Sequence, residues 1–156
     1  MYTLYYSPGV CSMSVHVSMR ELGLDFKLHK IDLSKGEQRS PEYLKINPRG
    51  QVGALMTPEG LLTENAAMMV YLNDKHGGTL IPKEGFARAK ALQWLMYANS
   101  TMHPAYSKCL FAIRNGGSEV QIKTACEAVQ SQWDLVEQQL TESGGPFLQG
   151  QHFGPG

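Results

Sequence analysis

The first 33 residues alternate between strand and helix patterns, which restricts the folds open to the chain. Residues 2–6 are a short aromatic and β-branched run, typical of a strand. Residues 12–22 carry apolar side chains at helical spacing and are followed by Gly23, a common helix stop. Residues 26–33 (FKLHKIDL) alternate apolar and polar side chains, as a half-buried strand does. This order predicts a right-handed βαβ unit with two parallel strands.

The next segment predicts a helix, a hairpin and another helix. Ser40 and Pro41 suit the N-cap and the first position of a short helix. The run ALMTPEGLLT places a TPEG turn between two apolar stretches, as a β-hairpin does. Residues 64–76 return to helical spacing and end at a glycine pair. We therefore expect an α/β domain over residues 1–78 with the order βαβαββα.

Strand patterns disappear after the segment 79–85 (TLIPKEG), which is typical of a linker. Residues 86–113 predict a long helix, which Pro104 should bend because proline removes a backbone hydrogen bond and clashes with the preceding turn. Ser118 and Gln121 have the spacing of a capping box that opens a second helix, running to about residue 142. The last ten residues indicate a loop. We expect an all-helical domain over residues 86–156.

Composition excludes several classes of function. The 14 basic and 14 acidic residues give zero net charge without a basic stripe, so nucleic acid is not an expected partner. No stretch is apolar enough to span a bilayer and no signal peptide is visible, so we expect a soluble cytoplasmic protein without membrane contact. The three cysteines form no CxxC and show no metal-like spacing to the five histidines. We therefore expect reduced thiols and no metal.

The segment SPGVCS places Cys11 at the turn between the first strand and the first helix. Unsatisfied backbone donors and the helix dipole favour a thiolate there, but cysteine is also among the most often buried residues, so both interpretations stay open. Tyr6 can direct its hydroxyl at this turn or pack in the core, and Ser12 can donate to the sulfur or cap the helix. Cys109 and Cys126 lie among apolar neighbours in helical patterns, which favours buried structural thiols.

Asn99 and His103 follow Leu95 at intervals of four, so all three share one helix face. This stripe is either the polar floor of a pocket or an ordinary helix surface. The sequence shows no serine–histidine–acid triad, phosphate-binding loop or glycosidase carboxylate pair.

Four blocks of the sequence resemble the soluble glutathione transferases, and most closely the bacterial beta class that uses a cysteine. The blocks are YYSPGVCS, INPRGQV, LLTEN and LQWLMYANSTMH, and they follow the order and spacing of that family over nearly the whole chain. The resemblance implies a thioredoxin-like N-terminal domain followed by a helical C-terminal domain. It also implies that glutathione binds on the first domain, with a small hydrophobic electrophile in a cleft facing the second.

The resemblance further implies roles for individual residues. Cys11 would be the thiol beside glutathione, able to form a mixed disulfide with it, and Val52 would pair its backbone with the cysteinyl part of the peptide. Glu64 and Asn65 would hold the γ-glutamyl end, because a helix N-terminus suits the carboxylate and Glu64 suits the ammonium. His103 would be a second catalytic residue, approaching from the helical domain. The further glutathione-binding residues would be Tyr6, Ser12, Lys35, Gln51 and Asn99, with Lys35 at the glycyl carboxylate.

The chain departs from the family pattern in two places. The family has a cis-proline after the position of Val52, where this chain has Gly53. Because a non-proline cis bond costs about 2.5 to 4 kcal/mol, we expect Val52–Gly53 to be trans. Either this loop presents Val52 in another way or glutathione binding is weakened. Family members also continue into several further helices, so we expect a truncated, incomplete helical domain with an exposed apolar face, losing order or sequence at residues 154–156.

The resemblance favours a homodimeric glutathione transferase enzyme that conjugates glutathione to electrophiles, or exchanges thiols and disulfides through Cys11. An alternative is a non-catalytic transferase-like protein that binds ligands or partners, which Gly53 favours. An isomerase or dehalogenase on the same scaffold would use the same glutathione chemistry.

Overall fold

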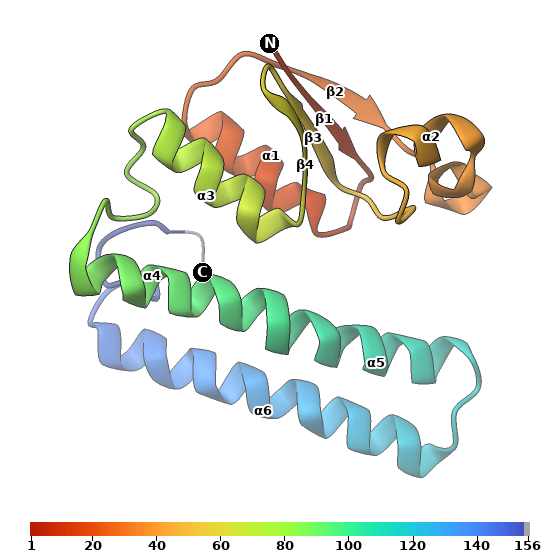
Figure 1. Ribbon diagram of the computed structural model, residues 1–156. Helices are drawn as coiled ribbons and strands as arrows, with labels where there is room; N and C mark the ends of the chain where they lie inside the picture. Colours follow the sequence, from red (N-terminus) through yellow and green to blue (C-terminus); the bar gives the residue numbers. More distant parts are fainter. Residues whose placement is uncertain (155–156) are drawn as a thin grey trace. The chain divides into compact units, whose positions relative to one another are not determined.

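A computed structural model describes residues 1–154 of the chain and contains two compact units, which divide after Thr79 (Figure 1). The first unit has the predicted order βαβαββα and the second is helical, so the predicted fold class is confirmed. The elements of the first unit are β1 (Tyr2–Tyr6), α1 (Ser12–Glu21), β2 (Phe26–Lys30), α2 (Pro41–Ile46), β3 (Ala54–Thr57), β4 (Gly60–Thr63) and α3 (Asn65–Lys75). Short 3-10 turns at Leu33–Lys35 and Glu37–Arg39 connect β2 to α2.

The four strands form one mixed sheet in the order β2-β1-β3-β4. β1 and β2 are parallel, as the βαβ pattern predicts, whereas β3 is antiparallel to both β1 and β4. α1 and α3 lie side by side and cover one face of the sheet (Figure 1). Their apolar side chains meet the inward residues of the central strands in a core whose fully buried members are Leu4, Val15, Met19, Ala54, Leu55, Met68 and Leu72.

β2 is less buried than its alternating pattern predicts. The strand ends at Lys30 instead of residue 33, and Leu28 on it is 38% exposed. β2 is an edge strand that has only β1 as a neighbour in the sheet; Phe26 at its start packs against His16 and Arg20 of α1, and its other four side chains are exposed. The expectation of a half-buried strand was therefore wrong, because alternation in sequence does not reveal whether a strand is central or at an edge.

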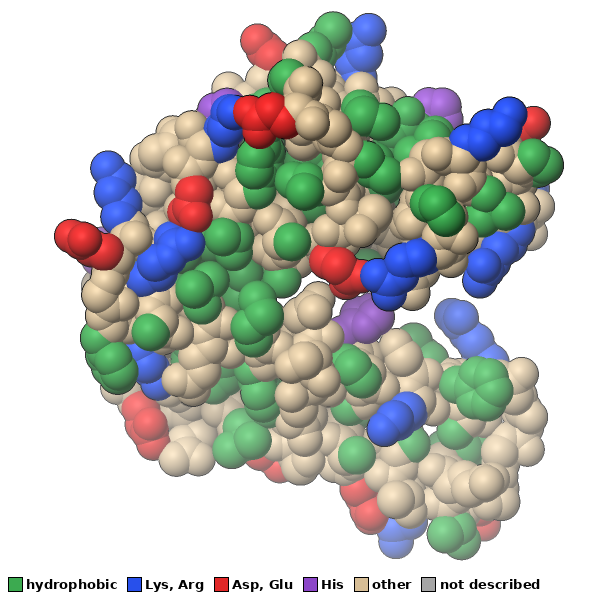
Figure 2. Space-filling view, viewed as in Figure 1, with side chains coloured by type: hydrophobic (Ala, Val, Ile, Leu, Met, Phe, Trp, Pro, Cys, Tyr) green, Lys and Arg blue, Asp and Glu red, His purple; other side chains and the backbone are tan. Residues whose placement is uncertain are grey.

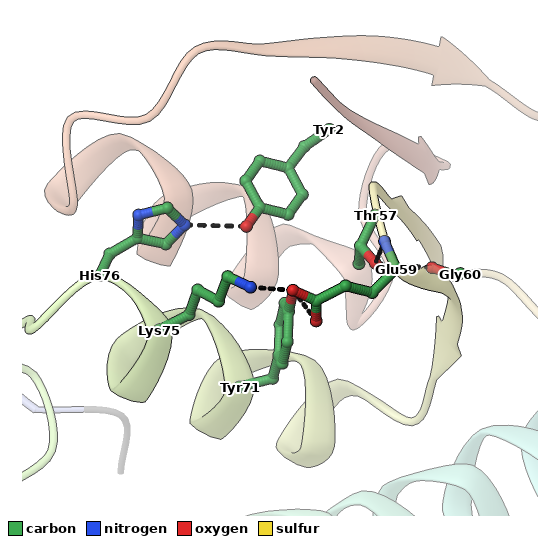
Figure 3. Close-up of polar contacts among 7 residues, drawn as sticks. All are labelled: Tyr2, Thr57, Glu59, Gly60, Tyr71, Lys75 and His76. Atoms are coloured by element: carbon green, nitrogen blue, oxygen red, sulfur yellow. Dashed lines mark hydrogen bonds and ion pairs between the residues drawn. The ribbon is translucent and has the colours of Figure 1, made fainter.

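A polar cluster attaches the β3–β4 turn to α3 (Figure 3). The Thr57 hydroxyl accepts from the Glu59 backbone N–H and donates to the Gly60 carbonyl, which shapes the turn. The Glu59 carboxylate then forms an ion pair with Lys75 and accepts a hydrogen bond from the Tyr71 hydroxyl at 3.0 Å. Tyr71 and Lys75 lie in the C-terminal half of α3, so these contacts hold that end of the helix beside the β3–β4 turn.

The second unit is built on three helices: α4 (Gly85–Tyr97), α5 (His103–Arg114) and α6 (Glu119–Ser143). A π-helical turn, Ala98–Met102, joins α4 to α5 within one continuous rod. Pro104 follows this turn directly, and its missing N–H and its ring disturb the turn before it, as the sequence predicts. The bend predicted at Pro104 stays a prediction.

α6 runs back along α5 and opens with the predicted capping box (Figure 1). The Ser118 hydroxyl accepts from the Gln121 N–H, and the Gln121 side chain accepts from the Ser118 N–H. The helix ends at Gly144, whose φ of 66° suits a glycine. The following loop contains two isolated bridges, Phe147 with Gly150 and Gln149 with His152. Residues 155 and 156, part of the segment expected to lose order, lie outside the described residues.

Large apolar side chains of the second unit reach the surface (Figure 2). On α5 and α6 these are Tyr106, Leu110, Phe111, Ile113, Val120, Trp133 and Leu135. Charged side chains of both signs are scattered over the face that Figure 2 shows, without a basic patch. None of the helices described in residues 1–154 is long and apolar enough to cross a membrane.

Candidate functional site

Cys11 lies in the turn that follows β1, at the N-cap position of α1, and its side chain is exposed. Its Sγ lies 3.8 Å from the carbonyl oxygen of Val52, within the range of a weak S–H···O contact. The exposure excludes the interpretation of Cys11 as a small buried hydrophobic side chain. A thiol at the N-terminus of a ten-residue helix is therefore open to ligands and lies beside the segment before β3.

Ser12 and Tyr6 have contacts other than the sulfur of Cys11. Ser12 is fully buried, and its hydroxyl accepts from the Ser7 N–H at 3.3 Å and lies 3.4 Å from the Ser7 carbonyl. Ser12 is the first residue of α1 and not its cap. The ring of Tyr6 faces His16, with the two ring centroids 6.3 Å apart. These two residues therefore shape the turn that presents Cys11.

The peptide bond between Val52 and Gly53 is cis, so the expectation of a trans bond was wrong. Gly53 packs against α1 and β1 so closely that an added Cβ would lie 2.9 Å from the Ser12 Cβ and 3.0 Å from the Tyr5 carbonyl oxygen. The cost of a non-proline cis bond refers to an isolated peptide. It does not include this packing, in which α1 and β1 hold Gly53 on two sides. Only a residue without a side chain lets the backbone at position 53 lie this close to Ser12 and Tyr5, and glycine is that residue.

Two buried side chains of α2 and its C-terminus fix the backbone just before this bond. The Tyr43 hydroxyl and the Asn47 Nδ2 both donate to the carbonyl oxygen of Gln51, each at 2.7 Å. Burial raises the pKa of Tyr43, so its hydroxyl stays protonated and remains a donor. The Gln51 side chain itself is exposed. The backbone of residues 51–53 is thus held in place, with Gln51 exposed and Val52 and Gly53 half-buried.

Glu64 and Asn65 lie beside the same segment, because Thr63 at the end of β4 pairs with Ala54 at the start of β3. Glu64 is the N-cap of α3 and has a φ of 69°, the only positive φ of a non-glycine residue in the described chain. Such a conformation is uncommon and often occurs at binding sites. The Glu64 carboxylate is exposed and forms an ion pair with Arg49.

Arg49 and Asn47 are site residues that the sequence reasoning missed. Asn47 Oδ1 accepts from the Arg49 N–H at 3.2 Å, which brings the Arg49 side chain into reach of Glu64. Both residues belong to the block INPRGQV, which resembles the family, and this is the sequence feature from which they could have been predicted.

The remaining predicted residues lie away from this cluster or in the other unit. Lys35 is exposed and its Nζ lies 3.6 Å from the Asp32 carboxylate. Asn99 lies in the π-helical turn and His103 begins α5, and both are exposed side chains of the second unit. Within residues 1–154, no three side chains of His, Cys, Asp or Glu gather as a metal site would require.

The fold and the cluster around Cys11 define a thioredoxin-like domain with an exposed thiol at the N-terminus of its first helix. A family model described as "Glutathione S-transferase, N-terminal domain" matches residues 1–74. Glutathione S-transferase F10 of Arabidopsis thaliana is 31% identical over 150 residues, which cover 90% of this chain and 70% of the relative. The chain therefore belongs to the glutathione S-transferase family.

Two further comparisons concern bacterial proteins. Glutathione S-transferase GstA of Escherichia coli O157:H7 is 39% identical over 108 residues, which cover 67% of this chain and 54% of that protein. The chain thus spans about half the length of this relative. A crystal structure of a glutathione transferase homolog from Sulfitobacter, with bound glutathione, has a TM-score of 0.83 and 30% identity, and the match covers 99% of this chain and 76% of that one.

Proposed function

We propose that the chain is a glutathione transferase of the cysteine type, the beta class, which binds glutathione on its first unit with the peptide sulfur beside Cys11. The observation that carries the proposal is the meeting of three segments at one exposed place: Cys11, the Val52 backbone, and the start of α3 at Glu64. The glutathione bound in the Sulfitobacter homolog supports the choice of ligand.

The charges around the site suit the parts of glutathione. The ammonium of the γ-glutamyl group pairs with the Glu64 carboxylate, and its carboxylate accepts from the backbone N–H groups at the start of α3. The Val52 backbone pairs with the cysteinyl residue, as an added strand would. In the proposal Lys35 meets the glycyl carboxylate, with Tyr6, Ser12 and Gln51 shaping the pocket wall. The roles predicted for Asn99 and His103, two exposed residues of the second unit, stay predictions.

Two reactions are open to this arrangement. In conjugation, the glutathione sulfur attacks a small hydrophobic electrophile and the leaving group departs with its electron pair. In exchange, the Cys11 thiolate attacks the glutathione sulfur of a mixed disulfide and releases the other thiol. A second glutathione thiolate then attacks the glutathione sulfur of the protein mixed disulfide, which frees Cys11 and yields glutathione disulfide. A cytoplasmic location, where glutathione is reduced, and a homodimer belong to the same proposal.

Replacement of Cys11 tests the proposal and separates the two reactions. We expect Cys11→Ala to abolish turnover of a glutathione mixed disulfide and to change conjugation of chlorodinitrobenzene much less, because only the first reaction needs the protein sulfur as nucleophile. Cys126→Ser is the matched control, since Cys126 is the other exposed cysteine. Unchanged disulfide turnover in Cys11→Ala would contradict the role of Cys11.

A second candidate is a transferase-like protein that binds ligands without catalysis, and Gly53 in place of the family proline favours it. Retention on immobilised glutathione together with turnover of either substrate rules this candidate out. Retention without turnover supports it. Failure of the folded chain to be retained contradicts the first proposal and favours this candidate, whose ligand or partner need not be glutathione.

A further inference from the structure

Two thiols meet between the helices of the second unit. Cys109 on α5 and Cys126 on α6 place their sulfur atoms 3.2 Å apart, as hydrogen-bonding partners. Both are present as thiols. This distance is shorter than an ordinary contact between two unbonded sulfur atoms, so a small movement suffices to bring them to bonding distance.

The helical hairpin explains why these cysteines meet. Cys109 lies eight residues before Gly117, and Cys126 lies eight residues after Ser118. The two helices are antiparallel and pack along their length, so positions equally far from the connecting turn face each other. The meeting therefore follows from the register of the whole hairpin, which the capping box at Ser118 fixes at one end.

The two thiols differ in access to solvent. Cys126 is exposed, whereas Cys109 is buried at 9% exposure. The hydrogen bond with Cys126, together with burial, raises the pKa of the Cys109 thiol. Cys109 therefore keeps its proton more firmly, and Cys126 is the thiol that a dissolved disulfide meets first.

We propose that Cys109 and Cys126 form a reversible dithiol–disulfide pair that links α5 to α6 and is oxidised by glutathione disulfide. The Cys126 thiolate attacks one sulfur of glutathione disulfide, the disulfide bond breaks, and one glutathione thiolate leaves. Cys109 then gives up its proton to solvent, and its thiolate attacks the Cys126 sulfur and releases the second glutathione. Two protein thiols are oxidised to one disulfide, and one glutathione disulfide is reduced to two glutathione molecules.

Peptide mapping of the full chain after incubation with glutathione disulfide tests the proposal. The Cys11→Ala variant is used so that the site thiol does not react. We expect a Cys109–Cys126 disulfide-linked peptide pair, a mass lower by two hydrogen atoms, no glutathione retained, and full reversal with reduced glutathione. In Cys11→Ala/Cys109→Ser the exchange stops halfway, so we expect one glutathione bound at Cys126. In Cys11→Ala/Cys126→Ser we expect no disulfide and no adduct.

The result that overturns the proposal is glutathione retained on Cys126 when Cys109 is present, or both thiols still free under conditions that oxidise Cys11 in the wild type. Circular dichroism of each variant verifies that it is folded before it is mapped. The disulfide between Cys109 and Cys126 forms without glutathione bound at Cys11. Failure of this test therefore leaves the proposed function untouched.

Discussion

At the scale of single residues, backbone positions determine the geometry of the proposed glutathione site more than side chains do. The carbonyl of Gln51 is held by Tyr43 and Asn47, and Gly53 is held by contact with Ser12 and Tyr5. Between them, Val52 is half-buried and its carbonyl oxygen lies 3.8 Å from the Cys11 Sγ. A peptide ligand that pairs with the Val52 backbone is recognised through its own backbone, so small shifts of residues 51–53 should affect binding strongly.

Glu64→Gln tests the proposed partner of the glutathione ammonium. The substitution keeps the size of the side chain but removes its charge, so we expect roughly fivefold weaker glutathione binding, a modest loss because the carboxylate is exposed. Titration calorimetry measures the change. Glu59→Gln is the control, because Glu59 is a similarly exposed glutamate in an ion pair with Lys75 at the β3–β4 turn. Equal effects of the two substitutions would contradict the assignment.

Gly53→Ala tests the close packing behind the Val52 backbone. The new Cβ would lie 2.9 Å from the Ser12 Cβ and 3.0 Å from the Tyr5 carbonyl, so the segment must shift. We expect a loss of about 1 to 3 kcal/mol in the free energy of unfolding, measured in urea, and loss of retention on immobilised glutathione. Gly117→Ala is the matched control, because its Cβ would lie 2.9 Å from the Ala112 carbonyl in the other unit. This variant should lose stability but keep glutathione binding.

Predictability from sequence differs among these residues for physical reasons. The turn that carries Cys11 follows from local pattern, since a strand and a helix meet there. The exposure of Cys11 and its contact with Val52 do not follow from local pattern, because they depend on the position of a segment 41 residues later in the chain. The pairing of Arg49 with Glu64 is non-local in the same way. The bond at Gly53 was predicted wrongly because the cost for an isolated peptide omits the packing of Ser12 and Tyr5 around it.

At the scale of elements, the order of strands and helices was predictable because periodicity and turn residues are local signals. The low burial of β2 was not predictable, because it results from the position of β2 at the edge of the sheet, with no strand on one side. In the second unit the irregular backbone at Ala98–Met102 lies in the turn directly before Pro104, where a proline disturbs a helix. The face shared by Leu95, Asn99 and His103 was deduced from regular helical spacing, which this π-helical turn interrupts.

Ser118→Ala tests the contribution of the capping box to α6. The substitution removes the acceptor for the Gln121 N–H at the start of a 25-residue helix. We expect the free energy of unfolding to fall by about 1 kcal/mol in urea denaturation. Ser131→Ala is the control within the same helix, because its exposed hydroxyl has only local partners in α6, the Ala128 carbonyl and the Gln132 side chain, and alanine favours helices. A similar loss at both positions would show that the cap contributes nothing specific.

At the scale of the whole molecule, the two units differ in how completely they bury their apolar side chains. The first unit encloses its core between the sheet and two helices, with Leu4, Val15 and Leu72 fully buried. In the second unit, large apolar side chains of α5 and α6 are exposed, including Phe111 at 69% and Val120 at 73%. Exposed apolar surface of this extent favours binding of other apolar surfaces. The helical unit should therefore dominate contacts with hydrophobic probes and the self-association of the chain.

Phe111→Ser tests this difference between exposed and buried apolar residues. Because Phe111 is mostly exposed, we expect the free energy of unfolding to change by no more than about 0.5 kcal/mol. The fluorescence of a bound hydrophobic dye should fall, since part of its binding surface is gone. Val136→Ala is the matched comparison on α6, where the side chain is 8% exposed. It should cost about 2 kcal/mol and not reduce dye binding. Strong destabilisation by Phe111→Ser would mean that this side chain is packed in solution, against a second copy of the chain or another part of it, and the exposed surface would not exist there.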